Sequence, residues 1–321
     1  MGKMLNLIQN ENMKIYRQLS TYIMLGLLIV IVIAAGFITK SSTQPAATNT
    51  DWKTQLTQTN AETQKTLTQI QTQPGVPEQS ITVLENGIKT NNYRIEHNLP
   101  PNQGKIVWDF VTQLAGAVSL VSLFSIIIAA GIVAGEFSSG TIKLLLIRPL
   151  QRWKILLSKY LAVLLFALAA LVLLFVTSFL VGTIFYGLSG VSQPYLGITN
   201  GNVVEINMLW HIFTTYAYGC VDLLMMVTFA FMISAVFRNN TLAVGISLFL
   251  MFTGSILVTL LSKYSWVKYV LFANTNLTVY TDGVPVVKGM TMTFSLLVLA
   301  AYFIIFNVIS WLVFTKRDVA A

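Results

Sequence analysis

Residues that could carry out covalent chemistry are few in this sequence, and they form no recognisable catalytic motif. There is no Gly-x-x-x-x-Gly-Lys-[Ser/Thr] phosphate loop, no Gly-x-Gly-x-x-Gly, no His-Glu-x-x-His and no Gly-x-Ser-x-Gly. The histidines His97 and His211 are far apart, and Cys220 is the single cysteine, which excludes an internal disulfide and a thiolate metal cluster from this chain alone. We therefore expect no catalytic residue, no metal site and no cofactor held by this chain.

Charged side chains inside apolar spans are the usual sign of an ion or proton pathway, and here only Asp222 qualifies. A secondary transporter normally has a relay of ionisable groups or discontinuous helices in two repeated halves, and one aspartate is not a relay. Asp222 is therefore a candidate intramembrane polar site, which either bonds a neighbouring helix or lines a lateral cavity. Any energy for transport would have to come from elsewhere.

The segment 136–159 has a pattern that an ordinary connecting loop does not need. Gly140 permits a reversal of the backbone, and the run 142–147 is apolar but too short to span a membrane. Pro149 then stops that helix, and the next span begins with basic side chains that we expect to reach the interface, namely Arg152, Lys154 and Lys159. The pattern predicts a short helix on the inner membrane surface that docks into a cytoplasmic partner; a plain positively charged loop is the alternative.

Long apolar blocks must position these residues. Only 10% of the 321 residues are charged and 55% are hydrophobic, with a mean hydropathy of +0.70. These values and the length of the blocks predict an all-α polytopic membrane protein with six transmembrane helices. The expected spans are 20–39, 108–135, 160–187, 209–236, 240–262 and 289–314. Gly131 and Gly135 have the spacing at which another helix can approach the second span closely.

Three further segments lie outside the spans. Residues 1–19 are polar with regularly spaced apolar positions, which predicts an amphipathic helix on the membrane surface or, alternatively, a poorly ordered flank. The segment 40–107 is rich in Thr, Gln and Asn, so we expect a small extracytoplasmic domain, with a disordered loop as the alternative for 41–50. Residues 263–288 mix aromatic and polar side chains, as in an extracytoplasmic or re-entrant hairpin.

Basic residues set the expected orientation. With the N-terminus inside, the inner segments carry eleven lysines and arginines, whereas the short outer segments carry three. The positive-inside rule then places both ends of the chain in the cytoplasm of a multi-pass plasma-membrane protein. The net charge of +8 comes from these scattered flanking residues, so we do not expect binding to nucleic acid.

At residues 135–159 the sequence resembles the permease subunits of type-2 ABC exporters. The shared pattern is Gly-Glu-Phe-x-x-Gly-Thr-x-Lys-x-Leu-Leu-x-x-Pro-x-x-Arg-x-x-x-x-x-x-Lys, which is the cytoplasmic loop of that family. The opening Asn-Glu-Asn-Met-Lys-Ile-Tyr-Arg at 10–17 resembles their N-terminal connecting helix, and Phe-Thr-Lys-Arg-Asp-Val at 314–319 resembles their C-terminal end. The long first outer segment, with Tyr-Arg-Ile-Glu-His-Asn-Leu-Pro-Pro at 93–101, is similar to a subgroup from Gram-positive bacteria.

The resemblance implies specific partners and roles. Such permeases pair with a second permease chain and with two copies of an ABC ATP-binding subunit, which would bind the ATP and magnesium. The positions that match the ATPase-coupling loop are Glu136, Gly140, Thr141, Pro149 and Arg152, and those that match the connecting helix are Glu11, Lys14 and Arg17. Closure of the ATPase would push these segments and shift spans one, two and five around a central path. The expected cargo is amphipathic: a peptide antibiotic, a lipid-like molecule or a drug.

Other classes of function remain open at the level of the sequence. A membrane sensor or immunity protein could bind a ligand through 40–107 without transporting it. A membrane-embedded transferase is a third class, but the sequence has few ionisable residues at either end of the spans.

Overall fold

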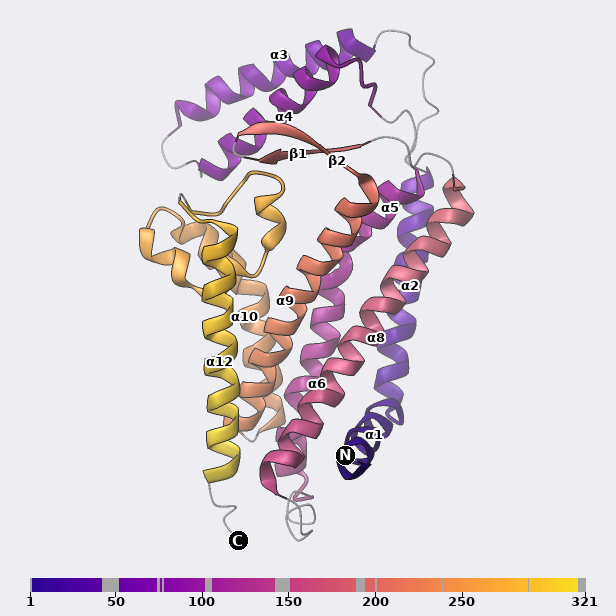
Figure 1. Ribbon diagram of the computed structural model, residues 1–321, viewed down its shortest axis with the longest axis vertical. Helices are drawn as coiled ribbons and strands as arrows, with labels where there is room; N and C mark the ends of the chain where they lie inside the picture. Colours follow the sequence, from indigo (N-terminus) through magenta and orange to yellow (C-terminus); the bar gives the residue numbers. More distant parts are fainter. Residues whose placement is uncertain are drawn as a thin grey trace.

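Long apolar helices form an elongated bundle with a polar helical layer across one end (Figure 1). The computed structural model describes residues 2–41, 52–73, 76, 78–101, 106–141, 151–188, 194–199, 201–237, 239–287 and 289–316. Within these, the six helices long and apolar enough to cross a membrane are α2 (Leu19–Ser41), the continuous α5–α6 unit (Val107–Ser138), α8 (Arg152–Tyr186), α9 (Met208–Phe237), α10 (Asn240–Leu261) and α12 (Met292–Lys316). The predicted six-span architecture is confirmed, and the chain is a multi-pass membrane protein.

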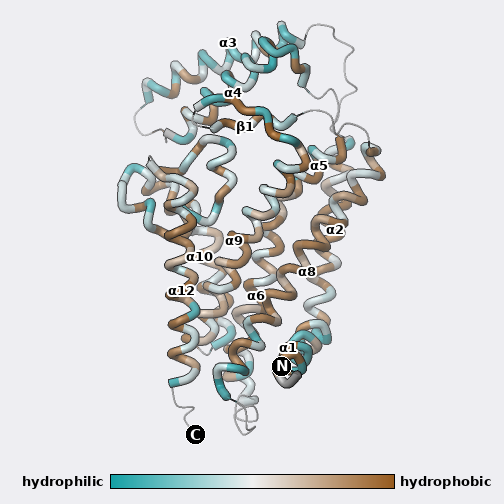
Figure 2. The backbone as a smooth tube through the Cα atoms, viewed as in Figure 1, coloured by the Kyte–Doolittle hydropathy of each residue, from teal (hydrophilic) through white to brown (hydrophobic). Residues whose placement is uncertain are grey.

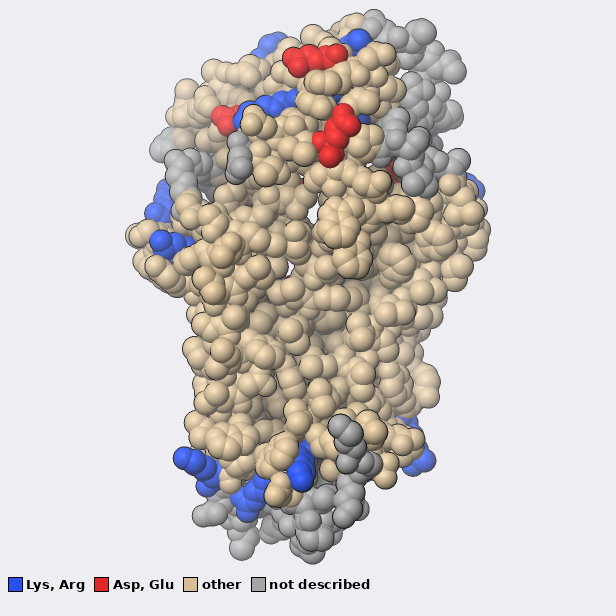
Figure 3. Space-filling view, viewed as in Figure 1, with Lys and Arg blue, Asp and Glu red and all other residues tan. Residues whose placement is uncertain are grey.

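The two ends of the bundle differ in composition. The first helix, α1 (Gly2–Tyr16), lies at one end, together with both chain termini (Figure 1). The bundle between the ends is predominantly hydrophobic, whereas α1 and the layer at the opposite end are largely hydrophilic (Figure 2). On the face seen in Figure 3, lysine and arginine side chains lie toward both ends, whereas the visible aspartate and glutamate side chains lie toward the end opposite α1. We call these ends the α1 end and the cap end.

The second and third spans differ in detail from the predicted ones. The second consists of α5 (Val107–Leu114) and α6 (Val118–Ser138), joined by a short 3-10 turn (Ala115–Ala117). The third, α8, begins at Arg152 rather than at residue 160 and is 35 residues long. It extends further because its basic residues are compatible with helical backbone and do not stop the helix.

Helices α6 and α9 form the centre of the bundle, and small residues bring them together. The Ser234 hydroxyl of α9 donates to the carbonyl oxygen of Ala130 at 2.5 Å and accepts from the backbone N–H of Ala134 at 2.9 Å. The predicted packing pair, Gly131 and Gly135, is not at this contact, because one position along a helix is turned by about 100°. A Cβ atom on Gly135 would meet no atom within 4 Å.

The cap end has its own small architecture. Helices α3 (Trp52–Gln71) and α4 (Glu78–Glu96) pack on each other above a two-stranded antiparallel sheet, β1 (Tyr195–Thr199) and β2 (Asn202–Ile206) (Figure 1). This sheet was not among the elements expected from the sequence. The short helical pieces Ser265–Tyr269, α11 (Leu271–Asn274) and Leu277–Tyr280 follow α10 at the same end.

Side-chain hydrogen bonds tie α4 to the elements beneath it. Asn86 donates to the carbonyl oxygen of Asp282 at 3.1 Å, and the Tyr93 hydroxyl donates to the Glu205 carboxylate at 3.2 Å. The helical layer is therefore fixed to the sheet and to the segment before α12.

Candidate functional site

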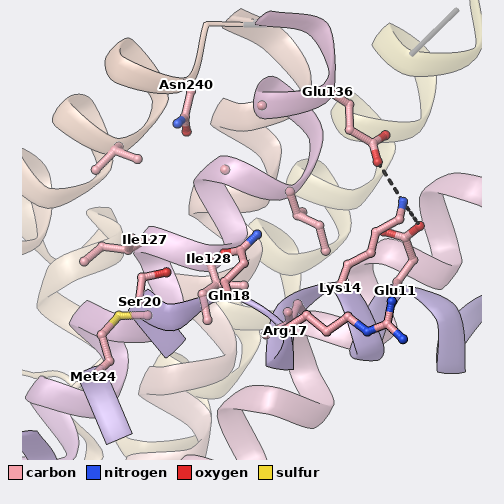
Figure 4. Close-up of a pocket in the computed structure, with 15 residues that line it drawn as sticks. Glu11, Lys14, Arg17, Gln18, Ser20, Met24, Ile127, Ile128, Glu136 and Asn240 are labelled. Atoms are coloured by element: carbon pink, nitrogen blue, oxygen red, sulfur yellow. Dashed lines mark hydrogen bonds and ion pairs between the residues drawn. The ribbon is translucent and has the colours of Figure 1, made fainter. Parts of the chain in front are cut away.

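Four charged side chains from three helices meet at the α1 end of the bundle. Glu11 and Lys14 come from α1, Glu136 from the last turn of α6, and Lys159 from the early part of α8. We call these four residues the charge cluster. Figure 4 shows Lys14 with Glu11 and Glu136, which belong to helices far apart in the sequence.

Opposite charges alternate around the cluster. The Lys159 ammonium lies 2.8 Å from Glu11 Oε2 and 2.7 Å from Glu136 Oε1. The Lys14 ammonium lies 2.7 Å from Glu11 Oε1 and 3.1 Å from Glu136 Oε1. Each lysine therefore bridges both carboxylates, and the cluster ties α1 to the ends of two membrane helices.

Lys159 corrects one expectation from the sequence. We expected its ammonium to reach the interface, but its side chain is only 1% exposed. A charge so far removed from water needs partners of opposite sign, and Glu11 and Glu136 supply them. One sequence signal pointed to a special role of Lys159, because it is the last lysine of the loop pattern. Its closeness to Arg152 and Lys154 nevertheless favoured a side chain exposed to solvent.

The environment of the cluster stabilises the charged forms of its members on α1. Burial alone raises the pKa of the Glu11 carboxyl, but the charge of Lys159 and the hydrogen bonds from both lysines outweigh it and hold the pKa below its usual value. Burial alone lowers the pKa of Lys14, yet its contacts with Glu11 and Glu136 raise that pKa overall.

Helix α6 ends two residues after Glu136, and a turn follows at residues 139–141. Gly140 has φ +72°, a left-handed conformation that glycine adopts without a steric cost, as the sequence analysis anticipated. The Thr141 hydroxyl bonds Ser139 at 3.0 Å and the Glu136 carbonyl oxygen at 3.5 Å, which closes the turn. Pro149 and the predicted surface helix at 142–147 lie outside the described residues. Arg152 donates to the Thr315 carbonyl oxygen at 3.3 Å, at the end of α12.

A cavity of about 650 Å³ adjoins the charge cluster. Its walls come from α1, the beginning of α2, the second half of α6 and the beginning of α10. Arg17, Gly131 and Gly135 also line it; an added Cβ atom would meet nothing within 4 Å at Gly135 but would lie 3.4 Å from Asn240 Oδ1, at the start of α10, at Gly131. Helix α1 and spans one, two and five thus surround an open space, as the labelled residues in Figure 4 show.

Comparison with known proteins identifies the family. The family described as "Protein of unknown function (DUF2705)" matches residues 80–320. This chain belongs to that family. It is also 47% identical over 320 residues to the uncharacterized protein YhcI of Bacillus subtilis (strain 168), covering 99% of this chain and 100% of the relative. The uncharacterized membrane protein YdbK of the same organism is 34% identical over 203 residues, which cover 62% of this chain and 78% of YdbK.

A second cavity of this DUF2705 protein, of about 480 Å³, lies toward the cap end. Asp222 lines it from α9, together with Tyr195, His211 and Asp282. Of the two roles considered for Asp222, the structure shows the second: it borders a cavity. No group of three or more His, Cys, Asp or Glu side chains suited to a metal ion occurs among the described residues.

Proposed function

We propose that this chain is the transmembrane permease subunit of an ABC transporter that exports an amphipathic substrate. In this proposal a separate ATP-binding subunit, present in two copies, binds ATP and magnesium, and a second permease chain completes the path. The α1 end faces the cytoplasm, consistent with the excess of basic residues expected there.

The observation that carries the proposal is the charge cluster. An ATPase that pushes on the turn 136–141 moves the end of α6, and the two carboxylates and two ammoniums link that movement to α1 and α8. Since α1 leads directly into α2, the first span moves together with α1. The cluster thus supplies a mechanical connection between the loop that resembles an ATPase contact and three helices of the bundle.

The cavity beside the cluster supports the same proposal. Packed helices resist displacement, whereas an open space of about 650 Å³ between α1, α2, α6 and α10 allows spans one, two and five to move relative to each other. The side chains that line it include charged groups and isoleucines, so its surface suits a molecule with polar and apolar parts.

The proposal is tested by searching the neighbouring reading frames for an ATP-binding subunit, co-expressing it with the chain and purifying the complex in lipid nanodiscs. We expect co-purification and an ATPase activity that falls to that of the free subunit in Glu136→Lys and in Gly140→Val. Lys154→Met, which changes a charge outside the cluster, is the control and should retain activity. Membrane insertion of each variant is checked by its yield in the membrane fraction. Full ATPase activity in both loop variants would refute the coupling role.

A further inference from the structure

The cap-end cavity has features that the proposed coupling does not use. Its lining contains two carboxylates, Asp222 and Asp282, but no lysine or arginine among its described residues. Neither carboxylate forms a recorded ion pair with a described lysine or arginine, unlike the carboxylates of the charge cluster. The cavity is thus lined by negative charge without a positive counterpart.

The polar partners that these carboxylates do have are neutral. The Tyr195 hydroxyl donates to Asp282 Oδ1 at 2.9 Å, and Thr275 lines the cavity close to the Asp222 carboxylate. A carboxylate can accept several hydrogen bonds, so both groups keep acceptor capacity for a ligand. Asp222 is only partly buried within the chain, which leaves it accessible from the cavity.

A third polar group of the cavity is buried and lacks a partner. His211 is 6% exposed, and its Nδ1 atom has no hydrogen-bond partner among the described residues. Its ring stacks on Tyr195, with centroids 3.5 Å apart and planes 9° from parallel. Buried polar atoms are normally paired, so an unpaired one at a cavity indicates space for an additional polar group.

The cavity also has depth. Asp222 lies eleven positions beyond His211 on α9, which corresponds to about 16 Å along the helix axis. The lining of the cavity also includes serine and threonine residues and two tyrosines, Tyr195 and Tyr218. Carboxylates together with aromatic faces favour cations with an organic skeleton.

We propose that the cap-end cavity binds an organic cation, with its ammonium group on the Asp222 carboxylate and its skeleton against Tyr195 and Tyr218. Asp282 attracts the cation at the cap-end part of the cavity. Cation binding requires no ATP-binding subunit, so the proposal stands apart from the coupling role. If both are correct, the transported molecule carries a positive charge.

The test uses a matched pair of fluorescent probes and the full chain in phosphatidylcholine nanodiscs, whose lipids have no net charge. Dansylcadaverine carries a primary ammonium group, and its N-acetyl derivative has the same skeleton without the charge. We expect saturable binding of dansylcadaverine and binding of the acetylated probe that is weaker by roughly tenfold or more, as for the loss of a hydrogen bond to a charged group.

Variants then assign the binding to the cavity. Asp222→Asn should weaken dansylcadaverine binding by about tenfold or more while leaving the acetylated probe unchanged. Glu62→Gln removes an exposed carboxylate of α3 and should change neither. The proposal is overturned if the wild type binds neither probe, if it binds both equally, or if Asp222→Asn binds dansylcadaverine as the wild type does. The comparison of probes on the wild type decides the matter even if Asp222→Asn does not fold.

Discussion

Lys159 has the least contact with water of the four residues in the charge cluster, and it touches both carboxylates. Removing a buried charge from water is costly, and the attraction of opposite charges offsets that cost only while all partners are present. Lys14 is 44% exposed and contributes less, because water screens its charge. Lys159 is therefore the member whose loss leaves the others least compensated.

We expect Lys159→Met to destabilise the protein by about 3–5 kcal/mol, the usual effect of removing one partner of a buried ion pair. Methionine keeps most of the side-chain volume, so the loss of stability results from removing the charge and not from creating a cavity. The measurement is unfolding of the purified protein in detergent. Lys154→Met, on the same helix but outside the cluster, is the control and should change stability little. Equal stability of the two variants would contradict the role of Lys159.

The cluster should also make stability depend on acidic pH. A carboxyl whose pKa is lower in the folded protein contributes stability above its unfolded pKa and loses it as pH falls through the folded value. For Glu11 this window lies below its ordinary value of 4.5. We expect the wild type to unfold at a higher temperature than Glu11→Gln at neutral pH, and the difference to shrink as pH falls below 4.5. Lys14 does not interfere, because its raised pKa confines its titration to pH above 10.5. A difference that persists unchanged in acid would contradict this account.

At the scale of elements, α10 is held to α11 by the close approach of a ring to a glycine. A Cβ atom on Gly254 would lie 2.5 Å from Cγ of Phe272, which is closer than two non-bonded carbon atoms approach. The Phe272 ring also packs edge-on against Phe229 of α9. The absence of a side chain at residue 254 thus allows the segment after α10 to pack against the bundle.

Two glycines of α10 therefore provide a matched pair of variants. We expect Gly254→Ala to destabilise by about 1–3 kcal/mol, since the new methyl group must displace the Phe272 ring. Gly245→Ala should be neutral or slightly stabilising, because its Cβ would meet nothing within 4 Å and alanine favours helix. Unfolding in detergent measures both. Equal effects would show that the ring moves aside easily.

The elements of the bundle were predictable because spans depend mainly on length and hydrophobicity, which any bilayer requires. The sheet at the cap end was missed, although Asn200-Gly201 between two short apolar runs is a typical hairpin signal. The contact of α6 with α9 uses Ala130 and Ala134 and not the glycine pair, a choice that the sequence does not reveal because all four residues are small. Likewise, sequence alone cannot show that Lys159 is buried, since its partner Glu11 is far away in the chain.

At the scale of the whole molecule, the α1 end and the cap end should lie on opposite sides of the membrane. Helices α1 and α3 lie at the two ends of the bundle (Figure 1) and each has exposed glutamines, such as Gln9 and Gln58. The single cysteine, Cys220, can be replaced to give a background without thiols. These three positions are sufficient to determine the orientation.

In a Cys220→Ser background, we expect Gln58→Cys to react with a membrane-impermeant maleimide on intact cells. Gln9→Cys should react only after the membrane is permeabilised, because the basic residues hold α1 inside. Labelling is followed by the mass of the purified protein. The reverse pattern would place α3 in the cytoplasm and contradict the assignment of the α1 end to the ATPase.

The two cavities approach each other along α6. The cap-end cavity reaches Ser119, the other reaches Ile127, and α6 rises about 12 Å between them. Within this interval the hydroxyls of Ser122 and Ser125 are buried and have no hydrogen-bond partner among the described residues. The stretch of α6 between the two cavities is therefore much shorter than the hydrocarbon core of a bilayer, roughly 30 Å, and it carries hydroxyl groups that can bind water molecules.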